Sequence, residues 1–204
     1  MPEQATVFSD RFQQAVGYAM AIHAPQVRKG TSVPYVAHLL GVASLVLEAG
    51  GDEDLAIAGL LHDAVEDAGG LPRAADIQAR FGKHVADVVL GCSDAVDAEL
   101  KKKQDYWERK QAYLTHLADA DSKVLLVSLA DKVHNARSIV TDLERFGPSV
   151  LDKFTGTVEQ ILEYYARCLE IGLDRKAPEP LTTPLANSVA DIARLLTGEA
   201  GKQK

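Results

Sequence analysis

The 204-residue sequence has few of the features that mark secreted, membrane or disulfide-rich proteins. Its two cysteines, Cys92 and Cys168, stand far apart in no CxxC pattern, so neither a disulfide framework nor a structural zinc site is predicted. The first residues, Met1 to Thr6, lack a basic stretch followed by an apolar run, and no apolar run approaches the length of a membrane span. We therefore expect a cytoplasmic protein with no membrane partner.

An excess of positive charge is also missing. The formal net charge is −7 at pH 7, whereas a general nucleic-acid binder needs a basic footprint, so no nucleic-acid partner is predicted. A local basic pocket for a nucleotide is still compatible with this charge. Arg28-Lys29 and Lys101-Lys102-Lys103 are the two candidate clusters, although a lysine run is more often a solvated loop.

Strand signals are nearly absent, and apolar residues recur at helical spacing along most of the chain. Asp52 is a predicted N-cap, and either Asp121 or Ser122 is expected to cap a long helix that ends at Gly147. Another long helix is expected over residues 149–172. The chain is long enough to bury a full core. We predict an all-α fold, a single-domain bundle of about eight to ten helices. Residues 1–175 are expected to form the domain, and 176–204 a linker, an amphipathic helix and a polar tail.

The segment Leu60-Leu61-His62-Asp63-Ala64-Val65-Glu66-Asp67 places four ionisable residues on an otherwise apolar helix. At about 100° per residue these four side chains form one polar stripe. A charge buried in such a helix costs several kcal/mol unless it is paired or bound to a metal. Adjacent imidazole and carboxylate groups are good metal ligands, and two further carboxylates follow one turn later. The stripe predicts a metal site next to an acid/base group.

Two other helices carry side chains of the same kinds. His38 follows Pro34-Tyr35-Val36-Ala37, and Asp131 and Asn135 stand four residues apart on one face of an apolar helix. A lone histidine is more often a hydrogen-bonded core residue, and carboxylates near a helix end are often solvated. When these candidates are considered together, we expect four side chains to surround a single ion: His38, His62, Asp63 and Asp131.

Nitrogen and oxygen ligands without sulfur suit manganese, iron or zinc. We expect Mn²⁺ as the cofactor, and other divalent metals are also compatible with this ligand set. The spacing of the ligands does not choose among these ions.

The motifs resemble those of a known family. YxxH at 35–38, HDxxED at 62–67 and LADKxHN at 129–135, together with Arg28-Lys29 and Phe81-Gly82, are similar to the hydrolase domain of RelA/SpoT proteins. These are HD-domain metal-dependent phosphohydrolases. The resemblance covers roughly residues 8–165, and we expect no synthetase or regulatory domain. The chain therefore resembles a stand-alone small alarmone hydrolase.

The resemblance implies an all-helical HD domain that removes the 3′-pyrophosphate of (p)ppGpp, yielding GDP or GTP and pyrophosphate. It implies manganese bound by His38, His62, Asp63 and Asp131. It also implies a catalytic pair, Glu66 and Asp67, and substrate contacts from Arg28, Lys29, Tyr35 and Asn135.

Two departures from the family pattern leave alternatives open. Thr31-Ser32-Val33 replaces a common Ser-Gly-acidic stretch, and Ser128 stands where a lysine is frequent. The substrate could therefore be another phosphorylated nucleotide. A non-catalytic alarmone-binding protein is a further alternative, although the intact charge cluster argues against it. The C-terminal helix could also bind a partner, and both monomer and homodimer are compatible with the sequence.

Overall fold

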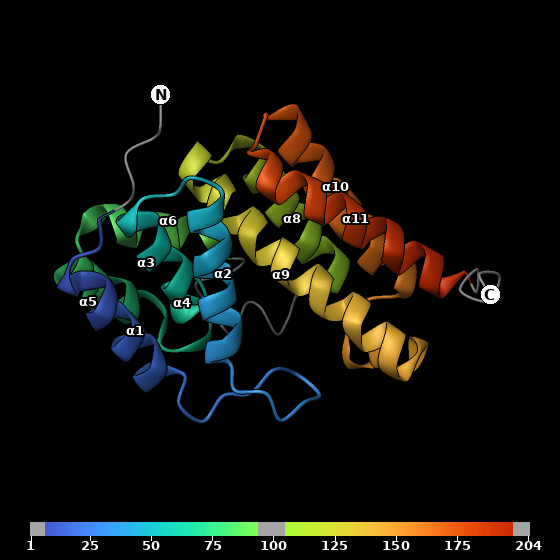
Figure 1. The fold of residues 1–204 in the computed structure, drawn as a ribbon, viewed down its shortest axis with the longest axis horizontal. Helices are drawn as coiled ribbons and strands as arrows, with labels where there is room; N and C mark the ends of the chain where they lie inside the picture. Colours follow the sequence, from blue (N-terminus) through green and yellow to red (C-terminus); the bar gives the residue numbers. More distant parts are fainter. Residues whose placement is uncertain (1–6, 94–104, 198–204) are drawn as a thin grey trace. The chain divides into compact units, whose positions relative to one another are not determined.

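The computed structural model describes residues 7–93 and 105–197. Within these ranges the regular elements are helices, and the strand-like contact is an isolated antiparallel bridge between Val27 and Pro34. The predicted all-α fold is confirmed. The chain divides into two compact units, residues 1–102 and 103–204 (Figure 1). The predicted boundary at residue 175 stays a prediction.

The first unit is built around a helix that is buried on all sides. Its described helices are α1 (Asp10–Ile22), α2 (Val36–Glu48), α3 (Glu53–Leu61), α4 (Ala64–Asp67), α5 (Gly70–Phe81) and α6 (Lys83–Cys92). Helix α3 packs against α1, α2 and α6, and every residue from Leu55 to Leu61 is buried. A helix that is apolar around its whole circumference belongs in the core. It is therefore a rigid support for the residues that follow it.

Polar caps fix the starts of α1 and α3. The Ser9 hydroxyl accepts a hydrogen bond from the Arg11 N–H at 3.2 Å, and the Asp52 carboxylate accepts one from the Leu55 N–H at 2.9 Å. The Ser9 N–H also donates to the Glu53 carboxylate at 2.7 Å, and this bond lowers the pKa of Glu53. Capping satisfies N–H groups that have no partner inside a helix. The predicted N-cap at Asp52 is confirmed.

The predicted continuous helix through the HDxxED motif is wrong. Helix α3 ends at Leu61, and the four-residue α4 begins at Ala64. The His62 Nδ1 lies 2.8 Å from the Gly59 carbonyl oxygen, so the imidazole donates to a carbonyl at the helix end. His62 and Asp63 therefore occupy a junction between two helices instead of one face of a single helix.

The loop between α1 and α2 is closed by backbone hydrogen bonds. The Arg28 N–H donates to the Val33 carbonyl at 2.8 Å, and the Tyr35 N–H donates to the Gln26 carbonyl at 2.9 Å. Gly30, with φ 76°, lies in the turn between them, where a residue without a side chain is favoured. This pairing holds Gln26 and Arg28 close to the start of α2.

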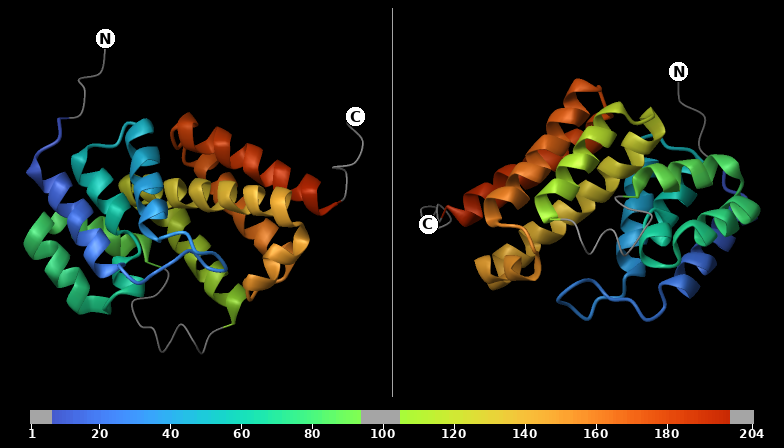
Figure 2. Two further views of the ribbon diagram at one scale, coloured as in Figure 1. Left: turned by 60° about the horizontal axis from the view of Figure 1, so that its bottom comes forward. Right: turned by 180° about the vertical axis from the view of Figure 1, so that it is seen from behind.

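The second unit is built along one long helix. Its described elements are α8 (Tyr106–Asp119), α9 (Ser122–Phe146), the 3₁₀ helix η1 (Pro148–Lys153), α10 (Val158–Asp174) and α11 (Glu179–Leu196). Helix α11 runs beside α9, and α10 packs on α8, α9 and α11 (Figures 1 and 2). Asp121 caps α9 by accepting from the Lys123 N–H at 2.9 Å, and Gly147, with φ 77°, ends it. Both predicted boundaries of α9 are confirmed.

The predicted helix over 149–172 is interrupted. The 3₁₀ helix η1 ends at Lys153, and α10 starts only at Val158. The restart is set by a capping box, in which the Thr157 hydroxyl accepts from the Gln160 N–H and the Gln160 side chain accepts from the Thr157 N–H. A strong local start signal therefore divides the segment.

The C-terminal helix α11 uses its apolar face inside its own unit. Leu181, Leu185 and Ile192 are fully buried, and α11 packs on α9 and α10. This packing is the ordinary role of an amphipathic helix. Within the described part of the chain, no helix is both long and apolar enough to cross a membrane.

Burial gives Cys168 a testable chemical property. This residue lies on α10 with no exposed surface, and burial raises the pKa of its thiol to about 12. Because the thiolate is the nucleophile, we expect iodoacetamide at pH 8 to leave Cys168 unmodified in the folded protein and to modify it in guanidinium. Peptide mass spectrometry measures both, with the half-buried Cys92 as the internal comparison. Equal labelling of the two cysteines in the folded protein would contradict this burial.

Candidate metal centre

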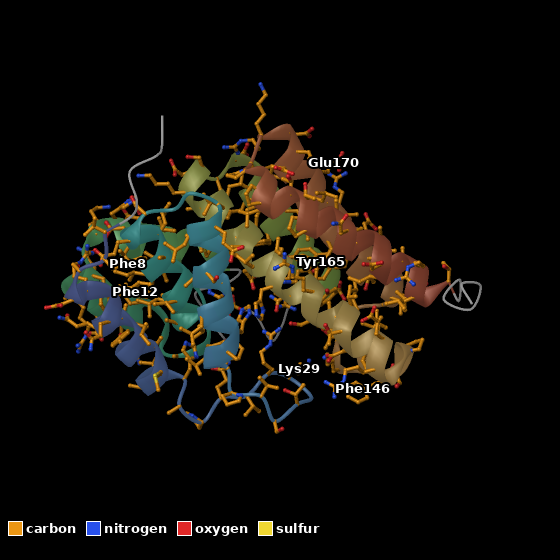
Figure 3. The ribbon with its side chains drawn as sticks, viewed as in Figure 1. Phe8, Phe12, Lys29, Phe146, Tyr165 and Glu170 are labelled. Carbon is orange, nitrogen blue, oxygen red and sulfur yellow. The ribbon has the colours of Figure 1, made fainter. Side chains whose placement is uncertain are left out.

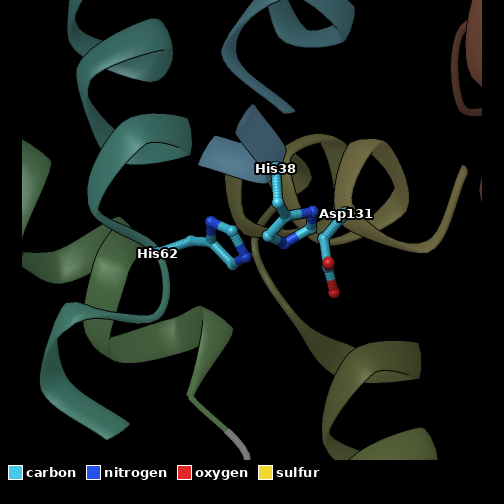
Figure 4. Close-up of side chains that lie close together, drawn as sticks. All are labelled: His38, His62 and Asp131. Atoms are coloured by element: carbon cyan, nitrogen blue, oxygen red, sulfur yellow. The ribbon is translucent and has the colours of Figure 1, made fainter. Parts of the chain in front are cut away.

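Two buried histidines lie side by side in the first unit. His38 stands in the first turn of α2 and His62 caps the C-terminus of α3, so the packing of α2 on α3 brings them together. Their ring centroids are 5.2 Å apart with the planes at 70° (Figure 4). Neither residue is more than 3% exposed. Burial of two imidazoles at one point is unusual unless they bind something or each other.

Asp63 completes a cluster with both histidines. Its Oδ2 lies 3.0 Å from the His62 Nε2 and 3.7 Å from the His38 Nε2. The His62 Nδ1 donates to the Gly59 carbonyl, so in the neutral ring the Nε2 carries the lone pair. A nitrogen lone pair and a carboxylate oxygen 3.0 Å apart repel each other unless a positive charge lies between them. Ligands about 2.1 Å from one ion lie about 3 Å from each other, so this geometry fits a metal.

Tyr35 and Arg28 lie next to this cluster. The Tyr35 hydroxyl donates to the Asp63 Oδ2 at 2.5 Å, and the Arg28 guanidinium carbon lies 5.9 Å from the centre of the Tyr35 ring. Lys29, the neighbour of Arg28, is exposed and projects from the same loop (Figure 3). Two of the predicted substrate residues thus lie beside the predicted metal ligands. The lysine run at 101–103 lies outside the described residues.

The predicted acidic pair lies on the short helix α4. Glu66 is half-buried and Asp67 is exposed. The Asp67 Oδ2 accepts a hydrogen bond from the Gln26 Nε2 at 2.8 Å, and the Gln26 Oε1 lies 2.6 Å from the His23 Nδ1. His23 and Gln26 were not predicted as site residues. The available signal is the close spacing of the polar residues His23, Gln26 and Arg28, the last of which is a predicted substrate residue.

In the second unit, Asp131 lies on α9 and is largely buried. Its Oδ2 accepts from the Lys132 Nζ at 2.6 Å, and its Oδ1 accepts from the Asn135 Nδ2 at 2.5 Å. The prediction that Asp131 and Asn135 share a face of one helix is confirmed. Burial and the nearby Asp131 carboxylate raise the pKa of Tyr165, which is labelled in Figure 3. Lys132 was not predicted as a site residue, and its burial beside a carboxylate is visible only in the structure.

The chemistry of these donors fits a divalent cation. Two buried histidines and a buried aspartate, His38, His62 and Asp131, are side chains of the ligand type (Figure 4). Imidazole and carboxylate donors without thiolate are typical of Mn²⁺, Fe²⁺ and Zn²⁺ sites. This donor set, with Asp63 beside the histidines, indicates divalent-metal binding.

Comparison with curated proteins finds relatives of similar length and also much longer ones. The chain is 35% identical over 162 residues to guanosine-3′,5′-bis(diphosphate) 3′-pyrophosphohydrolase MESH1 of Xenopus tropicalis, covering 78% of this chain and 80% of the relative. It is 34% identical over 138 residues to the Drosophila melanogaster MESH1, covering 66% and 73%. A Synechocystis relative, a probable guanosine-3′,5′-bis(diphosphate) 3′-pyrophosphohydrolase, is 33% identical over 126 residues. The chain spans only 16% of that longer protein.

Two solved structures share the fold. One is described as a metazoan ortholog of SpoT that hydrolyzes ppGpp and plays a role in starvation responses. It is 28% identical, with a TM-score of 0.72 over 94% of this chain and 99% of the other. A protein from Listeria monocytogenes is 26% identical, with a TM-score of 0.63 over 78% of this chain and 99% of the other. The HD-domain family model matches residues 15–152, which is more than half of the sequence. With this match over most of its length, and with His38, His62 and Asp131 buried, the chain belongs to the HD-domain family.

Proposed function

We propose that this protein hydrolyses the 3′-pyrophosphate of (p)ppGpp to GDP or GTP and pyrophosphate. The observation that carries the proposal is the likeness, over 94% of this chain and 99% of the other, to a structure described as hydrolysing ppGpp. Two relatives named as 3′-pyrophosphohydrolases are also matched over 80% and 73% of their length. The HDxxED and LADKxHN motifs support the same activity. A cytoplasmic location, and the choice between monomer and homodimer, stay predictions.

The proposed activity includes one cation bound by His38, His62, Asp63 and Asp131, with Mn²⁺ as the expected ion. The family match from residue 15 to residue 152 contains all four residues. Their nitrogen and oxygen donors suit manganese, although iron and zinc accept the same donors. When bound, such an ion stabilises developing negative charge and lowers the pKa of a water molecule.

Glu66 and Asp67 are assigned the proton chemistry. Glu66 accepts a proton from the attacking water, and Asp67 orients that water. The water oxygen forms a bond to the phosphorus next to the ribose 3′-oxygen. The bond from this phosphorus to the 3′-oxygen breaks with its electron pair on the oxygen, which then takes up a proton. The products are a 3′-hydroxyl nucleotide and pyrophosphate.

Four residues are assigned to substrate binding. Arg28, held against the Tyr35 ring, either stacks on the guanine or pairs with phosphate, since a planar guanidinium suits both. Lys29 adds positive charge from the exposed side of the same loop. Asn135 uses its amide oxygen toward the sugar while its amide nitrogen bonds Asp131.

One observation favours a different substrate within the same family. The loop beside Arg28 has Thr31-Ser32-Val33 in place of the Ser-Gly-acidic stretch of the family pattern. The Thr31 hydroxyl is used inside the loop, donating to the Arg28 carbonyl at 3.0 Å and accepting from the Val33 N–H at 3.1 Å. This loop places no carboxylate next to Arg28. Another phosphorylated nucleotide, such as a 2′- or 3′-phosphorylated cofactor, is the alternative substrate.

The proposal predicts the products of a simple incubation. Purified protein with ppGpp and MnCl₂ is expected to release GDP and pyrophosphate, resolved by ion-exchange chromatography, and EDTA is expected to stop the reaction. In a panel with other phosphorylated nucleotides, we expect ppGpp to have the highest kcat/KM. Intact ppGpp beside a hydrolysed cofactor would favour the alternative substrate. Tight ppGpp binding with no hydrolysis of any nucleotide would indicate the non-catalytic sensor.

A further inference from the structure

His23 is a buried histidine for which the proposed reaction has no role so far. It caps the C-terminus of α1 and is 3% exposed. Its Nδ1 lies 2.6 Å from the Gln26 Oε1, and the Gln26 Nε2 donates to the Asp67 Oδ2 at 2.8 Å. A continuous path of two hydrogen bonds therefore joins a core histidine to the exposed carboxylate on α4.

The partners at the two ends of this path fix its direction. An ionised carboxylate only accepts hydrogen bonds, so the Gln26 amide must present its NH₂ group to Asp67. The Gln26 carbonyl oxygen then faces His23, and a carbonyl also only accepts. The proton of the neutral His23 ring must therefore be on Nδ1.

The surroundings of the other ring nitrogen point to the same tautomer. The His23 Nε2 is buried and has no hydrogen-bond partner among the residues that the structure describes. A proton on Nε2 would leave a buried donor unsatisfied, which is unfavourable. The Nδ1–H tautomer avoids this cost and satisfies Gln26.

His23 also contacts the residue that orients the proposed metal ligand. Its ring lies 5.4 Å, centroid to centroid, from the ring of Tyr35 at an interplanar angle of 33°. The Tyr35 hydroxyl in turn donates to Asp63. The His23 ring thus contacts two side chains that bond carboxylates of the HDxxED motif. Gln26 bonds Asp67, and Tyr35 bonds Asp63.

We propose that His23 is a positioning residue, held as the Nδ1–H tautomer, which fixes the Asp67 carboxylate in one orientation through Gln26. The inference rests on the proposed function for the role of Asp67. Asp67 is exposed on a four-residue helix, so its carboxylate would otherwise sample several rotamers. Outer partners of this kind set the orientation of reacting groups and typically contribute about 10–100-fold.

The tautomer is measurable without any enzyme assay. In protein labelled with ¹⁵N-histidine, long-range ¹⁵N–¹H spectra at pH 8 distinguish Nδ1–H from Nε2–H, and His23→Phe identifies the signals of His23. We expect only the Nδ1–H form in the native protein. Asp67→Ala is expected to add a minor Nε2–H fraction, because the Gln26 amide no longer has to present its NH₂ group outward, while the buried Nε2 still lacks a partner. An Nε2–H signal in the native protein, or no change in Asp67→Ala, would overturn the inference.

Kinetics test the positioning role. Gln26→Met keeps the length of the side chain but removes both hydrogen bonds, so kcat for ppGpp is expected to fall about 10–100-fold. KM and the calorimetric affinity for Mn²⁺ are expected to stay within about twofold, since Gln26 is assigned to neither substrate nor metal binding. Gln14→Met, an exposed glutamine on α1, is the matched control and is expected to leave kcat unchanged. An unchanged kcat in Gln26→Met would overturn the positioning role.

A second variant, Gln26→Glu, tests the two hydrogen bonds of Gln26 separately. It also gives an independent result if Gln26→Met folds poorly. Gln26→Glu keeps an acceptor for the His23 Nδ1–H but repels Asp67. We expect kcat to fall while the Nδ1–H signal of His23 persists, and a normal kcat would contradict the inference. The native protein in the same assay tests the proposed function separately. If it leaves ppGpp intact, the proposed function fails. The His23 tautomer and its response to Asp67→Ala still test whether the hydrogen-bonded path to Asp67 exists.

Discussion

Asp63→Ala is expected to lower the rate of ppGpp hydrolysis by on the order of 10³-fold and to abolish tight Mn²⁺ binding. The Asp63 carboxylate lies 3.0 Å from the His62 Nε2 and 3.7 Å from the His38 Nε2, and it accepts from the Tyr35 hydroxyl. The substitution removes the charged donor nearest to both imidazoles. Initial rates by chromatography and Mn²⁺ titration by calorimetry measure the two effects.

Asp87→Ala is the matched control for this substitution. Asp87 is an exposed aspartate of α6 that pairs with Lys83 at 2.7 Å, in the same unit as Asp63. We expect its removal to leave both turnover and Mn²⁺ affinity unchanged. An Asp63→Ala protein that binds Mn²⁺ as the native protein does would show that Asp63 is not a ligand.

The second large effect is expected at Glu66. Glu66→Gln keeps the size of the side chain but prevents it from accepting a proton, so kcat is expected to fall by about 10²–10⁴-fold. The affinity for Mn²⁺ is expected to be unchanged, because Glu66 lies one turn beyond the proposed ligands, on α4. Single-turnover rates and a parallel Mn²⁺ titration separate the two properties.

Glu48→Gln controls for the loss of a carboxylate as such. Glu48 is exposed at the end of α2, where it accepts from the Ser44 hydroxyl at 2.9 Å, and its substitution is expected to leave kcat unchanged. Undiminished turnover in Glu66→Gln would remove Glu66 from the proton chemistry. A joint loss of Mn²⁺ binding and turnover would instead make it a ligand.

Local signals in the sequence were enough to predict the helices and several of their ends. Asp52 and Asp121 cap helices as predicted, because an N-cap needs only a side chain and the next backbone N–H groups. The break after Leu61 was missed because periodicity continues through it, whereas the His62 ring bonds the Gly59 carbonyl. The break before α10 was also missed. Thr155-Gly156-Thr157 is a local signal for it, but the apolar spacing of the segment favours a continuous helix.

The site was predicted where its residues follow a local pattern and missed where they depend on distant partners. Asp131 and Asn135 stand four residues apart, and the structure confirms their contact. Gln26 gains its role only from Asp67, which is 41 residues away in the chain. Helical spacing cannot reveal such a contact, because it depends on how the loop before α2 packs beside α4.

In the proposed reaction, water attacks the phosphorus next to the ribose 3′-oxygen of ppGpp. The most direct test of this step is turnover of ppGpp by the native protein in H₂¹⁸O with Mn²⁺, followed by mass spectrometry of both products. Attack at this phosphorus is expected to place one ¹⁸O atom in pyrophosphate and none in GDP. Label in the nucleotide, release of single phosphates, or intact ppGpp would contradict it.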